Sequence, residues 1–191
     1  MMGISSPAKR YEDYALVLDF LPYGRPSAGR GRHASMPIAQ LIGETFFTLL
    51  EAEVKRGLTL SPHERIYVGR DARDKISRIM GRIDYKELTA SAKAELESVV
   101  EELVRGQEGR FVEFFNEAQA ITPRMHALEL LPGIGKKTMW QIINEREKSP
   151  FKSFKDIQER AGIPDPARLI AKRIVEELSG ESKYRIFVRA D

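Results

Sequence analysis

Short runs in which apolar and polar residues alternate occupy the first half of the chain. A period of two is the pattern of a β-strand with one face on a core and the other on solvent. The runs cover residues 14–20, 45–54, 65–70 and 76–85, while residues 38–47 fit a helix or a strand. Since the runs are short and no helical pattern separates them, we expect a small antiparallel β-barrel rather than a parallel sheet.

The pattern changes to a helical period after residue 88. Residues 89–104 place apolar side chains three and four positions apart, the spacing of an amphipathic helix, and a second helix is expected over 110–120. Helical segments separated by turns continue from 122 to 179. Residues 183–190 alternate again, and because a lone strand needs a partner we expect them to return to the N-terminal sheet.

These patterns together predict an α+β fold in three parts. Residues 1–88 should form the β-barrel, with 181–191 as its returning strand. Residues 89–119 should form acidic connecting helices, and residues 120–180 an all-α domain. The helical part would then be an insertion into the barrel.

Composition narrows the functional classes. Of the 191 residues 42% are hydrophobic, which is enough for a buried core, and the absence of cysteine excludes disulfides, iron–sulfur clusters and thiolate zinc sites. No apolar run is long enough to span a bilayer, and the N-terminus lacks the apolar stretch of a signal peptide. We therefore expect a cytoplasmic protein with no membrane partner.

The distribution of charge says more than its sum. Residues 90–118 contain three basic and seven acidic side chains, a net charge of −4, whereas the whole chain carries +3. The rest of the chain therefore holds +7. A site for a polyanion is expected outside this acidic stretch.

The most unusual local sequence is Pro132-Gly133-Ile134-Gly135, which separates two apolar runs and is followed at once by two lysines. We interpret residues 122–131 as a helix, the four-residue turn as a hairpin, and about Lys136 as the start of the next helix. Both glycines can take a positive φ without a Cβ clash. The isoleucine between them can point inward and pack where the two helices meet.

The start of that second helix offers a site for an anion. Its first four N–H groups have no acceptor within the helix, they lie at the positive end of the helix dipole, and the glycines leave room for close approach. Two lysines add cationic charge, so a phosphate group fits. The residues predicted to form this site are Gly133, Ile134, Gly135, Lys136, Lys137 and Thr138.

This stretch resembles the helix-hairpin-helix motif, in which an apolar residue and Pro-Gly-apolar-Gly precede a base and small residues. The resemblance implies binding of a DNA or RNA backbone through the hairpin amides, without sequence specificity. A plain helical turn stopped by glycine is the alternative. The two glycines, the isoleucine and the lysine pair together favour the motif.

A second, degenerate copy lies within residues 154–178, where Ala161-Gly162-Ile163-Pro164 aligns with the first turn. Pro164 has no N–H and cannot take a positive φ. Asp165 followed by Pro166 is a good helix cap, and its carboxylate would occupy the place of a phosphate. We expect the second hairpin to be structural. The pair resembles the tandem domains of repair and recombination proteins, such as the second domain of RuvA.

Taken from end to end, the chain resembles a small archaeal family of unknown function whose members are described as predicted RNA-binding proteins. The resemblance rests on the alternating runs, the acidic helix, LPGIGKK and KYRIFVRAD. It implies a barrel like the oligonucleotide/oligosaccharide-binding (OB) fold beside the tandem hairpin domain. It does not by itself choose between RNA and DNA.

Two further features bear on nucleic acid. The Gly/Pro/Ser-rich loop 24–33 carries Arg25, Arg30 and Arg32 and fits either a flexible clamp on a polyanion or a solvated loop. Exposed aromatic residues would be needed for base stacking, and Trp140, at helical spacing, is most simply interpreted as core. The tyrosines considered for stacking are Tyr23, Tyr67 and Tyr85.

Catalysis finds little support in the residues. Asp156 follows the first hairpin at about the distance of the catalytic aspartate of base-excision glycosylases, but its neighbours FKDIQ lack the setting those enzymes use. The histidines are scattered without ligand spacing, and no phosphate loop is present. We predict no catalytic residue, metal or cofactor.

Our prediction is a non-enzymatic protein that grips the phosphate backbone of a nucleic acid, with RNA as the expected partner. The alternatives are a DNA-binding accessory of repair or recombination, and a protein-interaction adaptor whose hairpins only pack helices.

Overall fold

The structure is a computed structural model that describes residues 11–25 and 36–188. The chain divides into two compact units, Met1–Glu95 and Leu96–Asp191. The fold is mixed α+β, as the alternation of the first half and the helical period of the second half predict.

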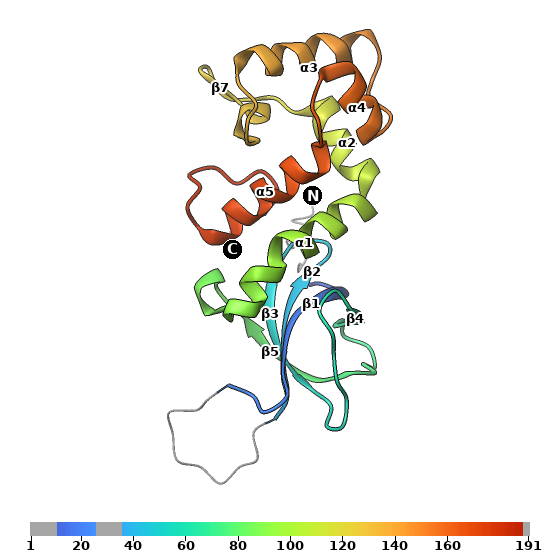
Figure 1. Ribbon diagram of the computed structural model, residues 1–191, viewed down its shortest axis with the longest axis vertical. Coiled ribbons are helices and arrows are strands. Elements are labelled where there is room, and N and C mark those ends of the chain that lie inside the picture. Colours follow the sequence, from blue (N-terminus) through green and yellow to red (C-terminus); the bar gives the residue numbers. More distant parts are fainter. Residues whose placement is uncertain (1–10, 26–35, 189–191) are drawn as a thin grey trace, which may run out of the picture. The chain divides into compact units, whose positions relative to one another are not determined.

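The first unit is a curled, five-stranded antiparallel half-barrel (Figure 1). Its strands lie in the order β4-β1-β2-β3-β5, and each strand is antiparallel to its neighbours. Breaks in register within β1 and between β3 and β5 accompany the curl, since bulges bend strands and increase twist. The strands are β1 (Tyr14–Leu21), β2 (Ile38–Gly43), β3 (Leu49–Val54), β4 (Arg65–Tyr67) and β5 (Ile76–Arg82).

Strand β2 is buried along its whole length because it lies at the centre of the sheet. Ala39 and Leu41 belong to the apolar core between the curled strands. On its other face Gln40, fully buried, donates to Glu51 Oε2 at 3.1 Å and accepts the Thr89 amide at 2.9 Å. These bonds satisfy the amide group of Gln40 and attach the segment before the first helix to the sheet.

A buried carboxylate holds the turn between β2 and β3. Glu12 is only 6% exposed and accepts the amides of Thr45 at 2.9 Å and Phe46 at 2.7 Å. Gly43 fits this contact, because a Cβ there would lie 2.0 Å from the Glu12 carboxyl carbon. The turn is therefore held by a side chain from outside the hairpin.

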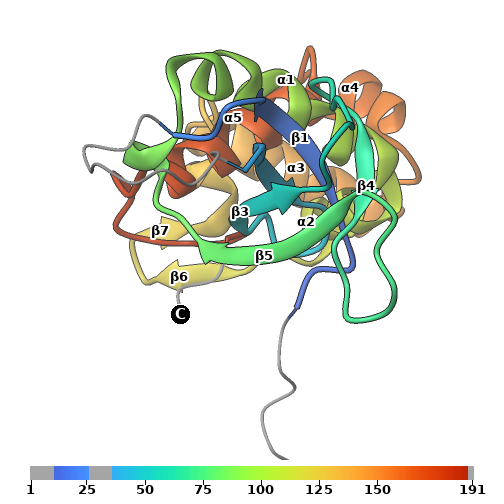
Figure 2. The same cartoon turned by 90° about the horizontal axis from the view of Figure 1, so that it is seen from below.

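The second unit is mainly helical (Figure 2). Helix α1, which spans the boundary between the units, buries the side chains predicted from its spacing, Leu96, Val99, Val100, Leu103 and Val104. The helices are α1 (Ala90–Gly106), α2 (Glu108–Glu117), α3 (Lys136–Lys148), α4 (Phe154–Ala161) and α5 (Pro166–Ser179). Three-residue 3-10 helix η1 (Tyr85–Glu87) precedes α1 in the first unit.

The helix expected over residues 122–131 is not present. That segment contains a small hairpin of β6 (Ala120–Thr122) and β7 (Met125–His126), followed by the 3-10 turn η2 (Ala127–Leu130). Pro123 lies in the two-residue turn between β6 and β7, where the fixed φ of proline suits a turn.

The predicted return of the C-terminal strand to the sheet is also wrong for residues 183–188, which form no strand. Glu177, fully buried in α5, accepts the amides of Ile186 at 2.9 Å and of Phe187 and Val188 at 3.0 Å. The same side chain binds Arg173 Nε at 3.0 Å. A carboxylate thus satisfies the amides that a neighbouring strand would otherwise bind.

Within the part of the chain that the structure describes, no helix combines the length and the apolar character needed to cross a membrane.

Replacing Glu177 with glutamine should destabilise the second unit by about 3 kcal/mol, because it leaves the buried Arg173 guanidinium facing an amide without charge. The matched control is Glu176→Gln, whose side chain is 49% exposed and should cost less than about 1 kcal/mol. Urea unfolding of both variants measures the difference. Equal stability of the two variants would contradict the role assigned to Glu177.

Candidate nucleic-acid interface

The turn between η2 and α3, residues 132–135, reverses the chain through one left-handed residue. Gly133 has φ +79°, and the Ile134 amide donates to Leu131 O at 3.1 Å. Ile134 is buried, as predicted from the sequence. Gly135 differs from the prediction, since it precedes α3 with φ −96° and ψ −170°. Only Gly133 uses the positive φ that glycine permits.

Gly135 is therefore not required by the backbone. Its φ suits any L-residue, and a Cβ added there would meet nothing within 4 Å. The position is an exposed one at the start of α3. A glycine here leaves open space above the first amides of the helix.

The start of α3 differs from the starts of the two helices that follow it. Ser153 Oγ accepts the Asp156 amide at 3.0 Å in α4, and Asp165 Oδ1 accepts the Arg168 amide at 3.3 Å in α5. Pro166 takes the first position of α5, as predicted. The residue before α3 is Gly135, which has no side chain to cap the helix, and the first turn of α3 contains no acidic residue.

The two lysines after the turn have different roles. Lys136 Nζ donates to Glu129 Oε2 and to Arg124 O, both at 3.0 Å, although its side chain is 62% exposed. Lys137 is exposed, and no acidic group in the described residues forms an ion pair with it. Thr138 is half-buried in the first turn of α3. Of the two lysines after the turn, Lys137 is thus the one without an ion pair in the described residues.

The 3-10 turn η2, which precedes residues 132–135, is capped by two reciprocal hydrogen bonds. His126 Nδ1 accepts the Leu128 amide at 3.1 Å, and Glu129 Oε2 accepts the His126 amide at 2.8 Å. That backbone hydrogen bond, with help from Lys136, lowers the pKa of Glu129. Burial, with the nearby charge of Arg146, lowers the pKa of His126 from its ordinary value of 6.5. Both groups are thus held in the forms that the cap requires.

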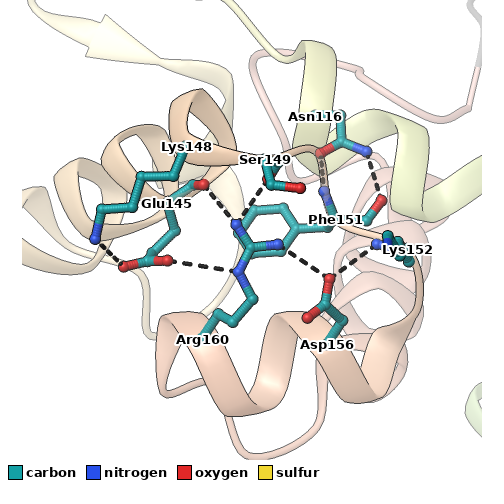
Figure 3. Close-up of polar contacts among 8 residues, drawn as sticks. All are labelled: Asn116, Glu145, Lys148, Ser149, Phe151, Lys152, Asp156 and Arg160. Atoms are coloured by element: carbon teal, nitrogen blue, oxygen red, sulfur yellow. Dashed lines mark hydrogen bonds and ion pairs between the residues drawn. The ribbon is translucent and has the colours of Figure 1, made fainter.

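The junction between α3 and α4 is held by Arg160, a residue that the sequence analysis did not single out (Figure 3). Its guanidinium donates to Glu145 O at 2.6 Å and Ser149 O at 2.7 Å, the carbonyls at the end of α3. It also lies over the Phe151 ring at 4.6 Å. Arginine at the last carbonyls of a helix is favourable both as a donor and as a cation.

Asp156 belongs to this junction. Its Oδ2 accepts the Lys152 amide and Arg160 Nη1, each at 3.0 Å, and the Lys152 amide is the main cause of the lowered pKa of Asp156. The carboxylate thus fastens the loop between α3 and α4 to the first turn of α4 (Figure 3).

Trp140 is not a core residue, contrary to the prediction. It is 56% exposed, whereas Met139 and Ile142 form the buried face of α3. Helical spacing places Trp140 four positions after Lys136 and three after Lys137, on the same side of the helix. The three-residue spacing of the apolar Met139 and Ile142 is the sequence signal that would have predicted an exposed position for Trp140.

Of the three arginines proposed outside the turn, Arg25 is the one that lies within the described residues. Arg25 lies in the first unit and donates through Nε to Glu51 Oε2 at 3.0 Å and through Nη2 to Glu87 O at 3.2 Å. Its guanidinium is thus bound within that unit. Arg30 and Arg32 lie outside the described residues.

Comparison with known proteins decides the family. The family model described as "Protein of unknown function (DUF655)" matches residues 11–189. The chain belongs to this family.

Proteins from two archaea are similar to this chain over most of its length. The uncharacterized protein MJ0038 of Methanocaldococcus jannaschii is 49% identical over 183 residues, which cover 95% of this chain and 82% of the relative. The crystal structure of Af1531 from Archaeoglobus fulgidus matches with a TM-score of 0.86 and 47% identity, covering 93% of this chain and 100% of that one.

The cap formed by His126 should make stability depend on pH. The pKa of His126 is lowered in the folded state, so near neutral to acidic pH the folded chain binds fewer protons at this imidazole than the unfolded chain. The free energy of unfolding should therefore fall as the pH drops through 6.5 and past the lowered pKa. His126→Asn keeps an acceptor that does not titrate. Urea unfolding between about pH 8 and pH 5 should show a smaller slope for this variant. Parallel curves for the two proteins would contradict the assignment.

Proposed function

We propose that this chain is a non-enzymatic nucleic-acid-binding protein that holds the phosphate backbone at the start of α3, with RNA as the expected partner. The observation that carries the proposal is the difference between the two turns. The first begins an uncapped helix after a glycine that the backbone does not need, and the second is closed by the Asp165 carboxylate. The resemblance of the first turn to the helix-hairpin-helix motif supports the same reading.

The chemistry of the site suits a phosphate rather than a base edge. Amides at a helix start are donors fixed in one direction, and they bind phosphate oxygens without reading sequence. No acidic residue occurs between Pro132 and Asn144, and the carboxylate nearest in sequence, Glu129, is paired with Lys136. The turn and the first half of α3 therefore contribute the positive charge of Lys137 and no carboxylate of their own.

Gly135→Ala tests whether a ligand approaches the turn closely. The variant should lower the free energy of unfolding by less than about 1 kcal/mol, since the φ of residue 135 suits alanine and the added methyl group meets open space, while alanine is a poorer residue than glycine before a helix. Binding to a labelled RNA should weaken by about tenfold or more, the loss expected for one or two charge-assisted hydrogen bonds. Fluorescence anisotropy measures the affinity.

The matched control for this substitution is Gly109→Ala on α2, where a Cβ also meets open space. It should leave binding unchanged. Gly133→Ala, in contrast, should lower stability by about 1–2 kcal/mol, because its φ of +79° is strained for alanine. If Gly135→Ala binds RNA as the wild type does, the turn is not the site.

Lys137→Glu tests the contribution of charge. It should weaken binding to RNA and DNA of every sequence alike, and each lost phosphate contact should reduce the log–log salt slope by roughly 0.7–0.9. Lys155→Glu on α4 is the control, because that side chain is 83% exposed and has only a 4.0 Å contact with Glu159. Titrations at several salt concentrations compare them. Equal salt slopes for both variants would contradict the proposal and favour a protein-interaction role.

A further inference from the structure

The fold leaves one large aromatic side chain of α3 in solvent. Trp140 is the sole tryptophan of the chain, and it is 56% exposed in a helix whose apolar face is made by Met139 and Ile142. Exposed hydrophobic residues are common singly, but tryptophan is the costliest to leave in water because its ring is the largest. The packing of α3 gives no reason for tryptophan at this position.

The position of Trp140 relates it to the proposed phosphate site. It follows Lys136 by four residues and Lys137 by three, so the three side chains share one side of the helix, within about 6 Å along its axis. Gln141 and Asn144 beside it are exposed and uncharged. A flat ring thus lies one helical turn from the uncapped amides, beside Lys137 and beside Lys136, whose ammonium is paired with Glu129.

This combination fits an unpaired nucleobase better than a protein partner. Proteins that bind single strands place aromatic rings beside a basic surface that follows the backbone, so that bases stack while phosphates meet the cations. In a duplex the bases are stacked on one another and their faces are not available. A protein partner would instead favour an apolar surround. The exposed residues one turn from Trp140 are basic or polar, and the apolar residue there, Ile143, is half-buried.

We infer that Trp140 is a stacking platform for an unpaired base, and hence that the ligand of the α3 site is single-stranded nucleic acid or a single-stranded region. The inference rests on the proposed function, which it narrows to a ligand class. A phosphate held at the start of α3 positions the strand, and the base of a neighbouring nucleotide lies against the indole.

The intrinsic fluorescence of the protein tests the inference directly, because all tryptophan emission comes from Trp140. Titration with a single-stranded oligouridylate, at one low salt concentration, should quench this emission in step with binding. Two probes serve as controls. A duplex RNA of the same length and an abasic oligomer should each quench far less, since neither offers a free base face.

Substitutions separate stacking from simple apolar contact. Trp140→Phe should retain most of the affinity for the oligouridylate, whereas Trp140→Leu should lose about tenfold, the order expected for one stacked base. Binding is measured here by the anisotropy of a labelled strand. Circular dichroism should show both variants folded, because an exposed helical position tolerates either residue.

Several outcomes would overturn the inference. Binding without quenching, with Trp140→Leu as tight as the wild type, would remove Trp140 from the site and leave the phosphate proposal standing. Equal quenching by the duplex or the abasic oligomer would contradict a stacked base. A concentration-dependent emission shift without nucleic acid would assign the surface to a second copy of the chain. Absence of binding to any probe would end both proposals.

Discussion

The need of backbone amides for acceptors governs much of this structure. An amide away from water without a partner costs about as much as a lost hydrogen bond, so each turn must supply an acceptor or remain open to solvent. Here carboxylates do this at several places. Glu12 binds the turn between β2 and β3, Glu177 binds the C-terminal segment, and Asp165 closes the start of α5. The start of α3 receives no such side chain.

The elements that depend on local pattern were predictable from the sequence. Alternation located β1, β4 and β5, and the three-and-four spacing located α1 with its buried face. The cap at Asp165 with Pro166 followed from the chemistry of those two residues alone. In each case the signal lies within a few consecutive residues, where backbone preference and side-chain chemistry agree.

Elements that depend on distant contacts were not predictable. Residues 183–188 alternate like a strand, but their amides bind Glu177, about ten positions earlier, which no periodicity reveals. Arg160 reaches back to the carbonyls of Glu145 and Ser149 in the same way. At the proposed site, the left-handed Gly133 and the buried Ile134 agree with the sequence prediction. The tether of Lys136 to Glu129, in contrast, depends on the fold of β7 and η2.

The two turns of the second unit show how one backbone shape supports two outcomes. Gly133 and Gly162 share a left-handed φ, +79° and +70°, and each is followed by a buried isoleucine. After Gly162 the chain provides its own anion, because Asp165 lies where the amides of α5 need an acceptor. After Gly133 it provides none, and Lys137 adds charge of the opposite sign. A carboxylate that closes a helix stabilises the fold, whereas a helix start without one leaves donors that water or a bound anion can satisfy.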